Sequence, residues 1–394
     1  MAITVESIRP ESDEDRWDLG GQAFGGTDAY DATRPSPEPD RIVAAYDDDR
    51  LVGTVASLDF AMTWGDGQVP CAGVSGVVVR PEDRGRGIAK AMLRESFDRM
   101  RDRGEVLAAL YPTTATLYRS VGFEVAGSYE WRKVPLSLLS GTGQDLAWRR
   151  VEFGDPAIRE VHERMSGRLD GWILGDDVWW RRAAHAWQTQ KSKNRYAYVG
   201  ARGSGDDRTD VAAAVYRYDR SDDRLYELGV DLLAGVDGHA VASTLGFLAA
   251  NGTTAGHLET TLPRDLLSLL VPNLQHTSVT SDWPWMLRLV DVAGAFGARR
   301  FPTSVSGRVE VDIRDDTLPW NAGPHVIEFS DGAADVSPGG SGALTIDVTD
   351  LAAIYAGNDV NLRLWSDRFA DGDGSGADLL HTACASHPTI PFFF

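Results

Sequence analysis

The sequence predicts an α+β protein built from two or three domains. A strand, a glycine turn and an amphipathic helix follow one another over residues 77–103, and the same order of elements returns over residues 225–250. From about Trp285 the pattern changes to short strands separated by glycine-rich turns. A chain of 394 residues, 43% of them hydrophobic, can form several cores, so we expect sheets with flanking helices in each part.

The first strand–turn–helix has the features of a phosphate site. Its strand ends at residues 77–79, and the turn Arg-Gly-Arg-Gly of residues 84–87 precedes a helix that begins near Ile88 and stops near Gly104. Backbone N–H groups at a helix start attract phosphate oxygens, and glycine lets a ligand approach the main chain. We therefore expect a pyrophosphate here. A dinucleotide fingerprint is disfavoured, because Lys90 stands where its third glycine is needed.

A second buried strand is predicted over residues 106–111, followed by Pro112 and a short helix that begins after the capping-type residues Thr113 and Thr114 and runs to Val121. Tyr118 lies on this short helix. If the two strands are parallel neighbours that diverge beyond Pro112, the gap can admit a pantetheine arm. The tyrosine can then reach a thioester sulfur.

At these residues the sequence resembles the GNAT acyltransferases, whose fold is a mixed, splayed sheet with flanking helices. The likeness rests on residues 77–89 and on Tyr118-Arg-Ser-Val-Gly-Phe123, and residues 3–139 have the length of one such domain. It implies acetyl-CoA as the co-substrate. The residues expected to bind acetyl-CoA are Val77, Val78, Val79, Arg84, Gly85, Arg86, Gly87, Ile88, Ala89, Lys90, Thr113 and Thr114.

The chain ends on Ile-Pro-Phe-Phe-Phe, which is unusually apolar for a terminus and indicates that the end is docked in a pocket. This layout is similar to the enhanced intracellular survival (Eis) family of N-acetyltransferases. The resemblance implies two tandem GNAT domains, a sterol-carrier-like domain and a C-terminal carboxylate in the active site. It assigns Tyr118 as general acid and the Phe394 carboxylate as base or amine anchor, with Phe392 and Phe393 expected to bury that carboxylate.

The polar segment of residues 140–145 is the clearest linker, so the expected domains are 1–140 (catalytic), 146–284 (a degenerate GNAT copy) and 285–394 (sterol-carrier-like). The turn of the second copy, expected at residues 231–238, contains Asp237 and no arginine, so we expect no cofactor there. Helices are predicted over residues 157–168, 179–190, 238–250 and 349–355 and near the end, and strands over 129–136, 211–218, 225–230, 286–290, 306–313, 325–329, 333–336 and 343–348.

A net charge of −19 favours cationic substrates and disfavours nucleic acid and anionic membranes. A small cationic amine, such as a polyamine or an amino sugar, or a basic peptide is the expected acceptor. The family's aromatic and acidic pocket positions fall here on Gly76, Phe393 and Gly26, so a reshaped pocket is expected. Its candidate residues are Trp17, Phe24, Asp28, Tyr30, Trp64 and Phe393, and core packing is the alternative for the aromatics Trp17, Phe24, Tyr30 and Trp64.

Cys71 and Cys384 are too few for a disulfide framework, and the scattered histidines indicate no metal site. Asp367, Asp371 and Asp373 superficially resemble a calcium loop, but a solvated loop is expected, because the glutamate of an EF-hand is missing.

No targeting or membrane-spanning segment is recognised, so a cytoplasmic protein is expected. The family resemblance implies a homo-oligomer, commonly a hexamer.

Two other functions remain open at this point. The chain could bind acetyl-CoA as a sensor without catalysis, which tight cofactor binding without thiol release would reveal. It could also carry lipid through its third domain, which co-purifying lipid would reveal. Neither accounts for the placement of Tyr118 together with the apolar end of the chain.

Overall fold

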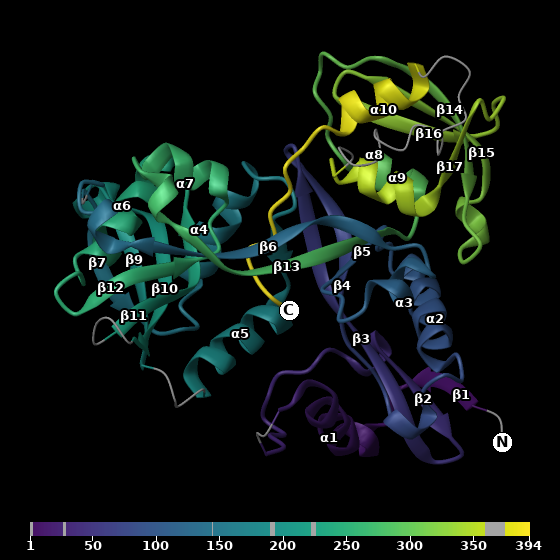
Figure 1. Ribbon diagram of the computed structural model, residues 1–394, viewed down its shortest axis with the longest axis horizontal. Coiled ribbons are helices and arrows are strands. Elements are labelled where there is room, and N and C mark those ends of the chain that lie inside the picture. The colour runs from purple at the N-terminus through teal and green to yellow at the C-terminus, as the bar shows by residue number, and fades with distance from the viewer. Residues whose placement is uncertain (1–2, 27–28, 144, 190–193, 222–225, 359–374) are drawn as a thin grey trace. The chain divides into compact units, whose positions relative to one another are not determined.

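The computed structural model describes residues 3–26, 29–143, 145–189, 194–221, 226–358 and 375–394 (Figure 1). Contacts divide the chain into two units. The first unit contains Met1–Gly127, Pro284–Pro388 and Phe394, and the second contains Ser128–Trp283 and Thr389–Phe393. The aspartates of the suggested calcium loop, Asp367, Asp371 and Asp373, lie outside the described residues.

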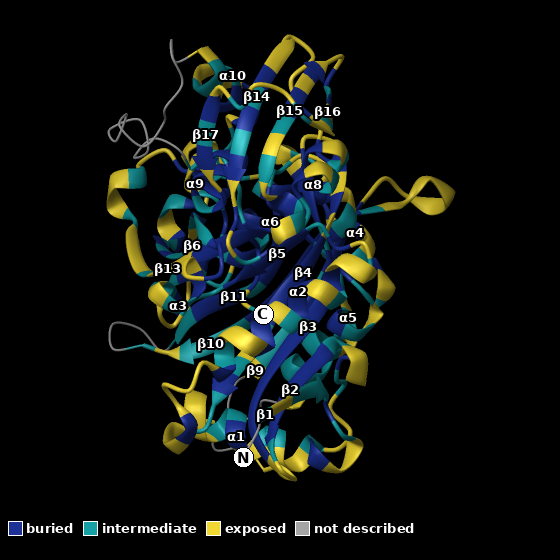
Figure 2. Cartoon of the chain, turned by 90° about the vertical axis from the view of Figure 1, so that its right-hand side faces the viewer, coloured by how far each residue is buried: buried dark blue, intermediate teal, exposed yellow. Residues whose placement is uncertain are grey.

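The first unit is built on a sheet whose centre is a long antiparallel hairpin. The hairpin turns at Gly65-Asp66, with Gly65 at φ +64°, as expected for a two-residue turn between twisted strands. Most residues of the two hairpin strands are buried (Figure 2). In spatial order the strands are β1 (Ile3–Ser7), β2 (Ile42–Asp47), β3 (Arg50–Trp64), β4 (Gly67–Val79), β5 (Leu107–Leu110) and the second half of β13 (Ser278–Leu289).

Helices cover both faces of this sheet. The predicted amphipathic helix is confirmed as α2 (Ile88–Asp102), and its buried residues pack on Val43, Ala45 and Val74. The helix ends at Gly104 (φ +76°), where the Glu105 N–H donates to the Met100 carbonyl at 2.9 Å. On the other face, α1 (Asp13–Phe24) buries Leu19 against alternate residues of the same strands.

The strand predicted over residues 286–290 forms, but its partner differs from the expectation. Met286 pairs with Leu110 of β5, antiparallel, so this strand completes the first sheet instead of opening the sterol-carrier-like part. Its mostly buried sequence fits a central strand equally well in either sheet, and only the long-range pairing distinguishes them. The boundaries proposed for three domains stay a prediction.

The rest of the first unit is a separate four-stranded sheet with three helices against it. All four strands and the helix over residues 349–355 were predicted from their alternation and turns. In spatial order the strands are β16 (Ala333–Pro338), β15 (Gly323–Ser330), β14 (Gly307–Arg314) and β17 (Leu344–Asp347), and the helices are α8 (Val292–Ala298), α9 (Val348–Tyr355) and α10 (Ser375–Cys384).

A buried ion pair links the two sheets of the first unit. Arg288 of β13 has no exposed surface, and its guanidinium donates to both carboxylate oxygens of Asp315 at 2.7 and 2.6 Å. Asp315 also accepts from the backbone N–H groups of Thr317 and Leu318 and from the Asn321 amide. The Arg288 guanidinium lies so close to Gly122 that a Cβ there would stand 2.6 Å from it. Glycine at 122 is therefore required for the pair to form.

The second unit repeats the strand-then-helix order of the first. Strand β11 (Tyr226–Gly235) extends further than predicted, because residues 231–235, expected in a turn, continue its nearly unbroken buried run. The helix that follows is α6 (Gly238–Ala249). In spatial order the sheet contains β6 (Glu124–Pro135), β12 (Ala255–Thr260), β11, β10 (Thr209–Arg220), β9 (Asn194–Arg202) and β7 (Ala147–Val151), with helices α4 (Pro156–Ser166), α5 (Asp177–Thr189) and α7 (Arg264–Leu270) and the short strand β8 (Ile173–Gly175).

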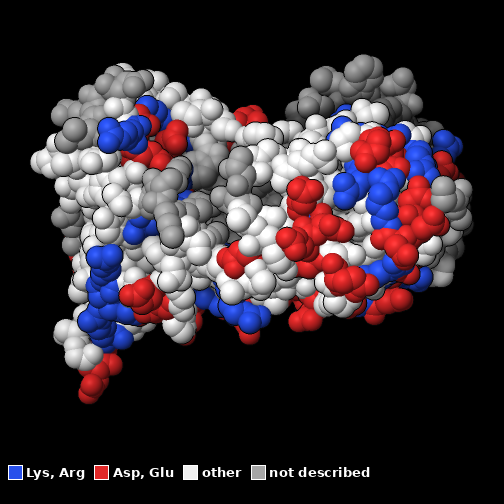
Figure 3. All heavy atoms as spheres, turned by 90° about the horizontal axis from the view of Figure 1, so that it is seen from below, with Lys and Arg blue, Asp and Glu red and all other residues white. Residues whose placement is uncertain are grey.

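Charged side chains are distributed as neighbours of opposite sign. On the face in Figure 3, acidic and basic groups lie beside one another, which agrees with the many surface ion pairs, such as Arg159 with Glu163 at 2.6 Å. Within the described residues, no helix is long and apolar enough to cross a membrane.

Removing the buried cation should destabilise the first unit strongly. We expect Arg288→Met to lower the free energy of unfolding by about 3–5 kcal/mol, because it leaves the buried Asp315 carboxylate without its counter-charge. Arg308→Met is the matched control, since Arg308 pairs with Glu310 but is 53% exposed, and its loss should cost less than about 1 kcal/mol. Urea unfolding measures both changes, and equal effects would contradict the role given to the buried pair.

Candidate active site

The site begins where two parallel strands separate. Strands β4 and β5 pair only over Cys71–Gly73 with Leu107–Ala109. Beyond that point β4 continues to Val79, whereas β5 ends at Leu110. The predicted parallel neighbours are confirmed, and their pairing ends two residues earlier in β5 than Tyr111, the end of the predicted strand. From Val74 onward, this edge of β4 faces no β5 strand.

A β-bulge lies within this open part of β4. Pairing with β3 shifts between Ala56–Ser75 and Thr54–Val78, so that Gly76 and Val77 both stand opposite Val55. Gly76 adopts φ +59°, and the Thr54 hydroxyl donates to its carbonyl at 3.2 Å. This bulge was not predicted from the sequence. A glycine within a β-branched run was the available signal.

The bulged strand presents backbone donors at its open edge. The Arg80 N–H donates to the Val52 carbonyl of β3 at 2.8 Å, and successive N–H groups of a strand point in opposite directions. The N–H groups of Val79 and Val77 therefore point away from β3, toward the edge that β5 has left. The Val79 carbonyl at the same edge accepts from Arg84 Nε at 3.3 Å.

The predicted phosphate turn follows directly. Gly85 and Gly87 both adopt left-handed backbone conformations, at φ +78° and +77°. Gly87 is the N-cap of α2, and as a glycine it has no side chain to cap the first turn of this helix. The first helical bond is donated by Ala91 to the Gly87 carbonyl, so the N–H groups of Ile88, Ala89 and Lys90 come before it. These bare donors fit a pyrophosphate.

The charged side chains of the turn divide into two roles. Arg86 donates to the carboxylates of Asp83 and Asp47, and Asp83 is buried and also paired with Arg50. Arg86 therefore fixes the loop, and its predicted contact with the cofactor stays a prediction. Arg84 and Lys90 are exposed, and neither forms an ion pair with a described residue. Their charges remain available to an anion.

The equivalent helix start in the second unit is closed. Asp237 is the N-cap of α6, and its carboxylate accepts from the Ala240 N–H at 2.8 Å. The same carboxylate pairs with Arg202 at 3.0 Å, which lowers the pKa of Asp237 below its usual value and keeps it ionised. In α6 the Ala240 N–H is thus satisfied by the Asp237 side chain, and a negative charge stands at the helix start.

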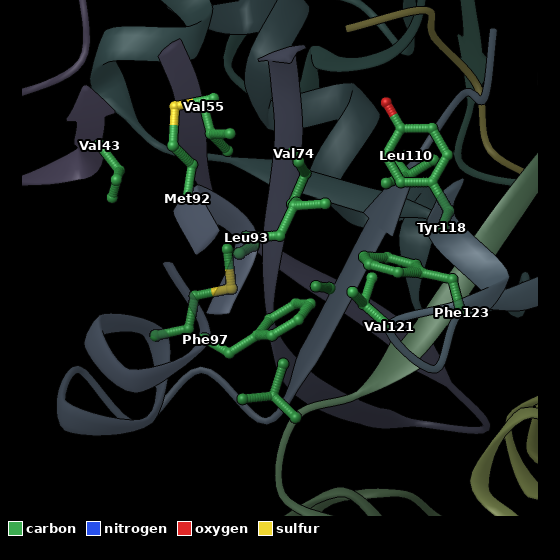
Figure 4. Close-up of a cluster of buried hydrophobic side chains, with 14 of the residues drawn as sticks. Val43, Val55, Val74, Met92, Leu93, Phe97, Leu110, Tyr118, Val121 and Phe123 are labelled. Atoms are coloured by element: carbon green, nitrogen blue, oxygen red, sulfur yellow. The ribbon is translucent and has the colours of Figure 1, made fainter. Parts of the chain in front are cut away.

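Tyr118 lies on α3 (Ala115–Arg119) between the open strands and the core. Only 5% of the residue is exposed, and its ring meets Phe123 edge-on at 5.9 Å. Figure 4 shows the hydroxyl at the end of the ring that points away from Phe123. Among the described residues it has no hydrogen-bond partner, and burial raises its pKa to about 12. Thr113 and Thr114, just before the helix, are exposed.

Phe394 lies in the first unit at the point of strand divergence. Its ring is 5.1 Å from Phe60 of β3 and 5.2 Å from Tyr111, the residue after β5. A Cβ built on Gly73 would stand 2.2 Å from the Phe60 ring and 3.1 Å from the Phe394 ring. The aromatic neighbours of Phe394 are therefore Phe60 and Tyr111. Phe392 and Phe393, which were expected to bury the carboxylate, are assigned to the second unit, and that expectation stays a prediction.

The suggested substrate-pocket residues fall in different places. Trp64 has no exposed surface and packs against Tyr355 at 5.4 Å, so it belongs to the core, which was the alternative interpretation. Trp17 and Tyr30 meet at 6.3 Å, and Phe24 is 58% exposed. Phe393 is 57% exposed in the second unit. Asp28 lies outside the described residues.

Comparison with protein families identifies the parts of this chain. Residues 5–126 and 171–289 each match an acetyltransferase (GNAT) domain, and residues 292–361 match a sterol carrier protein domain. The first match spans the open strands, the phosphate turn and Tyr118. The fold and site thus define an acetyltransferase of the GNAT superfamily, with two GNAT domains followed by a sterol-carrier-like domain.

Individual relatives narrow the assignment. An uncharacterised N-acetyltransferase of Streptomyces griseus is 28% identical over 82% of this chain and 81% of its own length. The N-acetyltransferase Eis of Mycobacterium tuberculosis is 24% identical over 78% of this chain and 76% of its own. The crystal structure of a GCN5-related N-acetyltransferase from Anabaena variabilis, 22% identical, matches all of both chains with a TM-score of 0.88. This chain belongs to the Eis-like N-acetyltransferases.

A side chain at Gly73 should disturb the site. We expect Gly73→Ala to lower the free energy of unfolding by about 1–3 kcal/mol, because the new methyl group must displace the rings of Phe60 and Phe394. Gly297→Ala is the control, since a Cβ there meets nothing within 4 Å and lies on helix α8, where alanine is the better helix former. Chemical unfolding of both variants is the measurement, and a Gly73→Ala protein as stable as the parent would contradict the packing described.

Proposed function

We propose that this acetyltransferase moves the acetyl group of acetyl-CoA directly to a primary amine of a cationic substrate. The observation that carries the proposal is the position of Phe394. Its ring packs over Gly73 where β4 leaves β5, in the same unit as Tyr118 and the phosphate turn. Two groups able to exchange protons thus belong to one unit, although they come from distant parts of the sequence.

The residues at the turn suit the pyrophosphate of acetyl-CoA. The bare N–H groups at the start of α2 would hold phosphate oxygens, and the exposed cations Arg84 and Lys90 would add attraction. Thr113 and Thr114, exposed just before α3, would add hydroxyl groups for the same ligand. Acetyl-CoA supplies an activated thioester, and the remaining steps belong to the chain's own groups.

Backbone N–H groups of β4 and the Tyr118 hydroxyl would stabilise different parts of the reacting thioester. The Val77 and Val79 N–H groups at the open edge of β4 would donate to the thioester oxygen as negative charge develops on it. When the new C–N bond forms and the C–S bond breaks, the Tyr118 hydroxyl would give its proton to the departing thiolate. A pKa raised to about 12 keeps this phenol protonated at neutral pH, so it serves as an acid and not as a base.

The Phe394 carboxylate completes the proton balance. We assign it to the amine, as the acceptor of the proton that the nitrogen loses on attack or as the anion that orients the ammonium form. An α-carboxyl is a weak base in water, with a reference pKa of about 3.5, and aromatic surroundings favour its protonation. Phe60 and Tyr111 provide such surroundings at this position.

The acceptor class follows from charge and aromatic surface. A net charge of −19 attracts cations, and exposed aromatic side chains such as Phe24 and Phe393 offer faces to an ammonium group. A small polyamine, an amino sugar or a basic peptide has this chemistry. A cytoplasmic location and a hexameric assembly stay predictions.

Removing the phenol oxygen should slow chemistry while leaving binding intact. We expect Tyr118→Phe to lower kcat about 100-fold with little change in the KM for acetyl-CoA, because only the proton donor is lost. Tyr46→Phe is the matched control: Tyr46 is fully buried, and its hydroxyl bonds the Arg9 N–H and Ser12, so stability should fall by about 1 kcal/mol while kcat is kept. Thiol release with a panel of amines measures kcat. An unchanged kcat in Tyr118→Phe would exclude the general acid.

Moving the terminal carboxylate should likewise lower kcat while leaving the binding of acetyl-CoA intact. Two glycines added after Phe394 would carry the carboxylate about 7 Å away, and we expect kcat to fall about 100-fold while acetyl-CoA still binds. The same glycines added before Met1 are the control. Calorimetry gives acetyl-CoA affinity and thiol release gives turnover. Full turnover with the extended end would remove Phe394 from the mechanism, and tight acetyl-CoA binding by the parent protein without thiol release for any amine would favour a sensor.

A further inference from the structure

The segment that leads to Phe394 is held along the second unit. The Thr389 N–H donates to the Asp170 carbonyl at 2.7 Å, and the Thr261 hydroxyl donates to the Pro391 carbonyl at 3.4 Å. The Phe393 backbone hydrogen-bonds to Tyr129, whose pKa is raised mainly by burial. Several residues in succession are therefore fixed before the chain reaches Phe394.

The strongest of these contacts is made by Phe392. This residue is only 6% exposed, and its ring centre lies 4.4 Å from Trp179 and 4.9 Å from His162. His162 stacks in turn on Trp172 at 5.0 Å, and Trp180 meets Phe392 edge-on at 6.4 Å. We call His162, Trp172, Trp179 and Trp180 the aromatic cage. They come from α4, the segment before β8, and α5 of the second GNAT domain.

His162 acts within the cage as a flat apolar ring. It has no exposed surface, and neither ring nitrogen has a hydrogen-bond partner among the described residues. Burial lowers its pKa to about 3, so the imidazole is neutral at physiological pH. Burying a polar ring without hydrogen-bond partners lowers the stability of a protein, so stability does not by itself explain this histidine. Its visible contacts are the faces of Trp172 and Phe392 and the edge of Trp180.

We propose that the aromatic cage is the anchor that positions the Phe394 carboxylate, so that the second GNAT domain serves the reaction of the first by holding the chain end. The proposal rests on the role assigned to Phe394 above. Phe393 belongs to the second unit and Phe394 to the first, and one peptide bond joins them. Two residues span at most about 7 Å, so fixing Phe392 confines the carboxylate to that radius. The cage residues are positioning residues and do not touch the reacting atoms.

The test compares two neighbouring phenylalanines in the full chain. Phe392→Ala empties the cage, whereas Phe393→Ala removes a ring that is 57% exposed. Each variant is treated with carboxypeptidase A in its native state, and the phenylalanine released from position 394 is quantified. We expect Phe392→Ala to raise the rate of release about tenfold or more, and Phe393→Ala to raise it much less, because proteolysis follows the population of the released end. Equal release from Phe392→Ala and the parent would overturn the anchor.

Kinetics separate this proposal from the proposed function. For Phe392→Ala we expect kcat to fall about tenfold to 100-fold while the KM for acetyl-CoA changes less than about twofold, since a misplaced group affects chemistry and not cofactor binding. Phe392→Leu, which refills part of the cage, should recover part of the loss. Faster release of phenylalanine with unchanged kcat would support the anchor and overturn the catalytic role of the carboxylate.

A second pair of variants tests the cage from its own side. Trp179→Ala should raise phenylalanine release as Phe392→Ala does. His162→Phe should leave release within about twofold of the parent, because the imidazole forms no hydrogen bond that a phenyl ring would lose. Thermal unfolding of each variant separates local release of the chain end from loss of the fold. Release unchanged by Trp179→Ala in a folded protein would overturn the proposal.

Discussion

The site depends on the lack of a side chain at Gly73. This residue is the last of β4 to pair with β5, and the rings of Phe60 and Phe394 occupy the space where its side chain would project. A strand position that is ordinarily filled by a β-branched residue is here filled by two aromatic rings from elsewhere in the chain. Strand divergence and the docking of Phe394 are therefore linked by one steric condition. The open edge of β4 then exposes the donors of the bulge at Gly76.

The two GNAT domains share an order of elements but differ in what stands before the helix. In the first, Gly87 caps α2 without a side chain, and the partial positive charge of the helix start is open to an anion. In the second, Asp237 caps α6, pairs with Arg202 and neutralises the same position. The residue at the N-cap therefore separates a helix start that is open to an anion from one that carries its own carboxylate. In the second copy, α4 and α5 instead contribute to the aromatic cage around Phe392, which we propose as the anchor of the chain end.

Local features of the site could be predicted from the sequence because their physics is local. The phosphate turn needs glycines in the left-handed conformation before a helix. The sequence has glycine at positions 85 and 87, and both adopt that conformation. Asp237 was expected only as an acidic residue in the turn of the second copy, and the structure makes it the N-cap of α6. The bulge at Gly76 was missed, because a glycine in a strand indicates either a bulge or a close contact until the partner strand is known.

Long-range pairings could not be predicted in the same way. The run at residues 286–290 fits any buried strand, and its pairing with β5 depends on a residue more than a hundred positions away. The Arg288–Asp315 pair is equally invisible in sequence, where a lone arginine in a strand indicates an exposed face. The Asp315 carboxylate accepts from Arg288, Thr317 and Leu318, whereas Nε and Nη1 of Arg288 have no hydrogen-bond partner among the described residues. The terminal aromatics show the limit most clearly. Three identical residues suggested one shared environment, whereas Phe392 is buried in a cage, Phe393 is exposed and Phe394 packs on Gly73. The end of the chain has no regular secondary structure and bends at Phe392, so its three side chains do not share one face as they would on one side of a helix. One ring can therefore anchor the end while the carboxyl group two residues further on meets other surroundings.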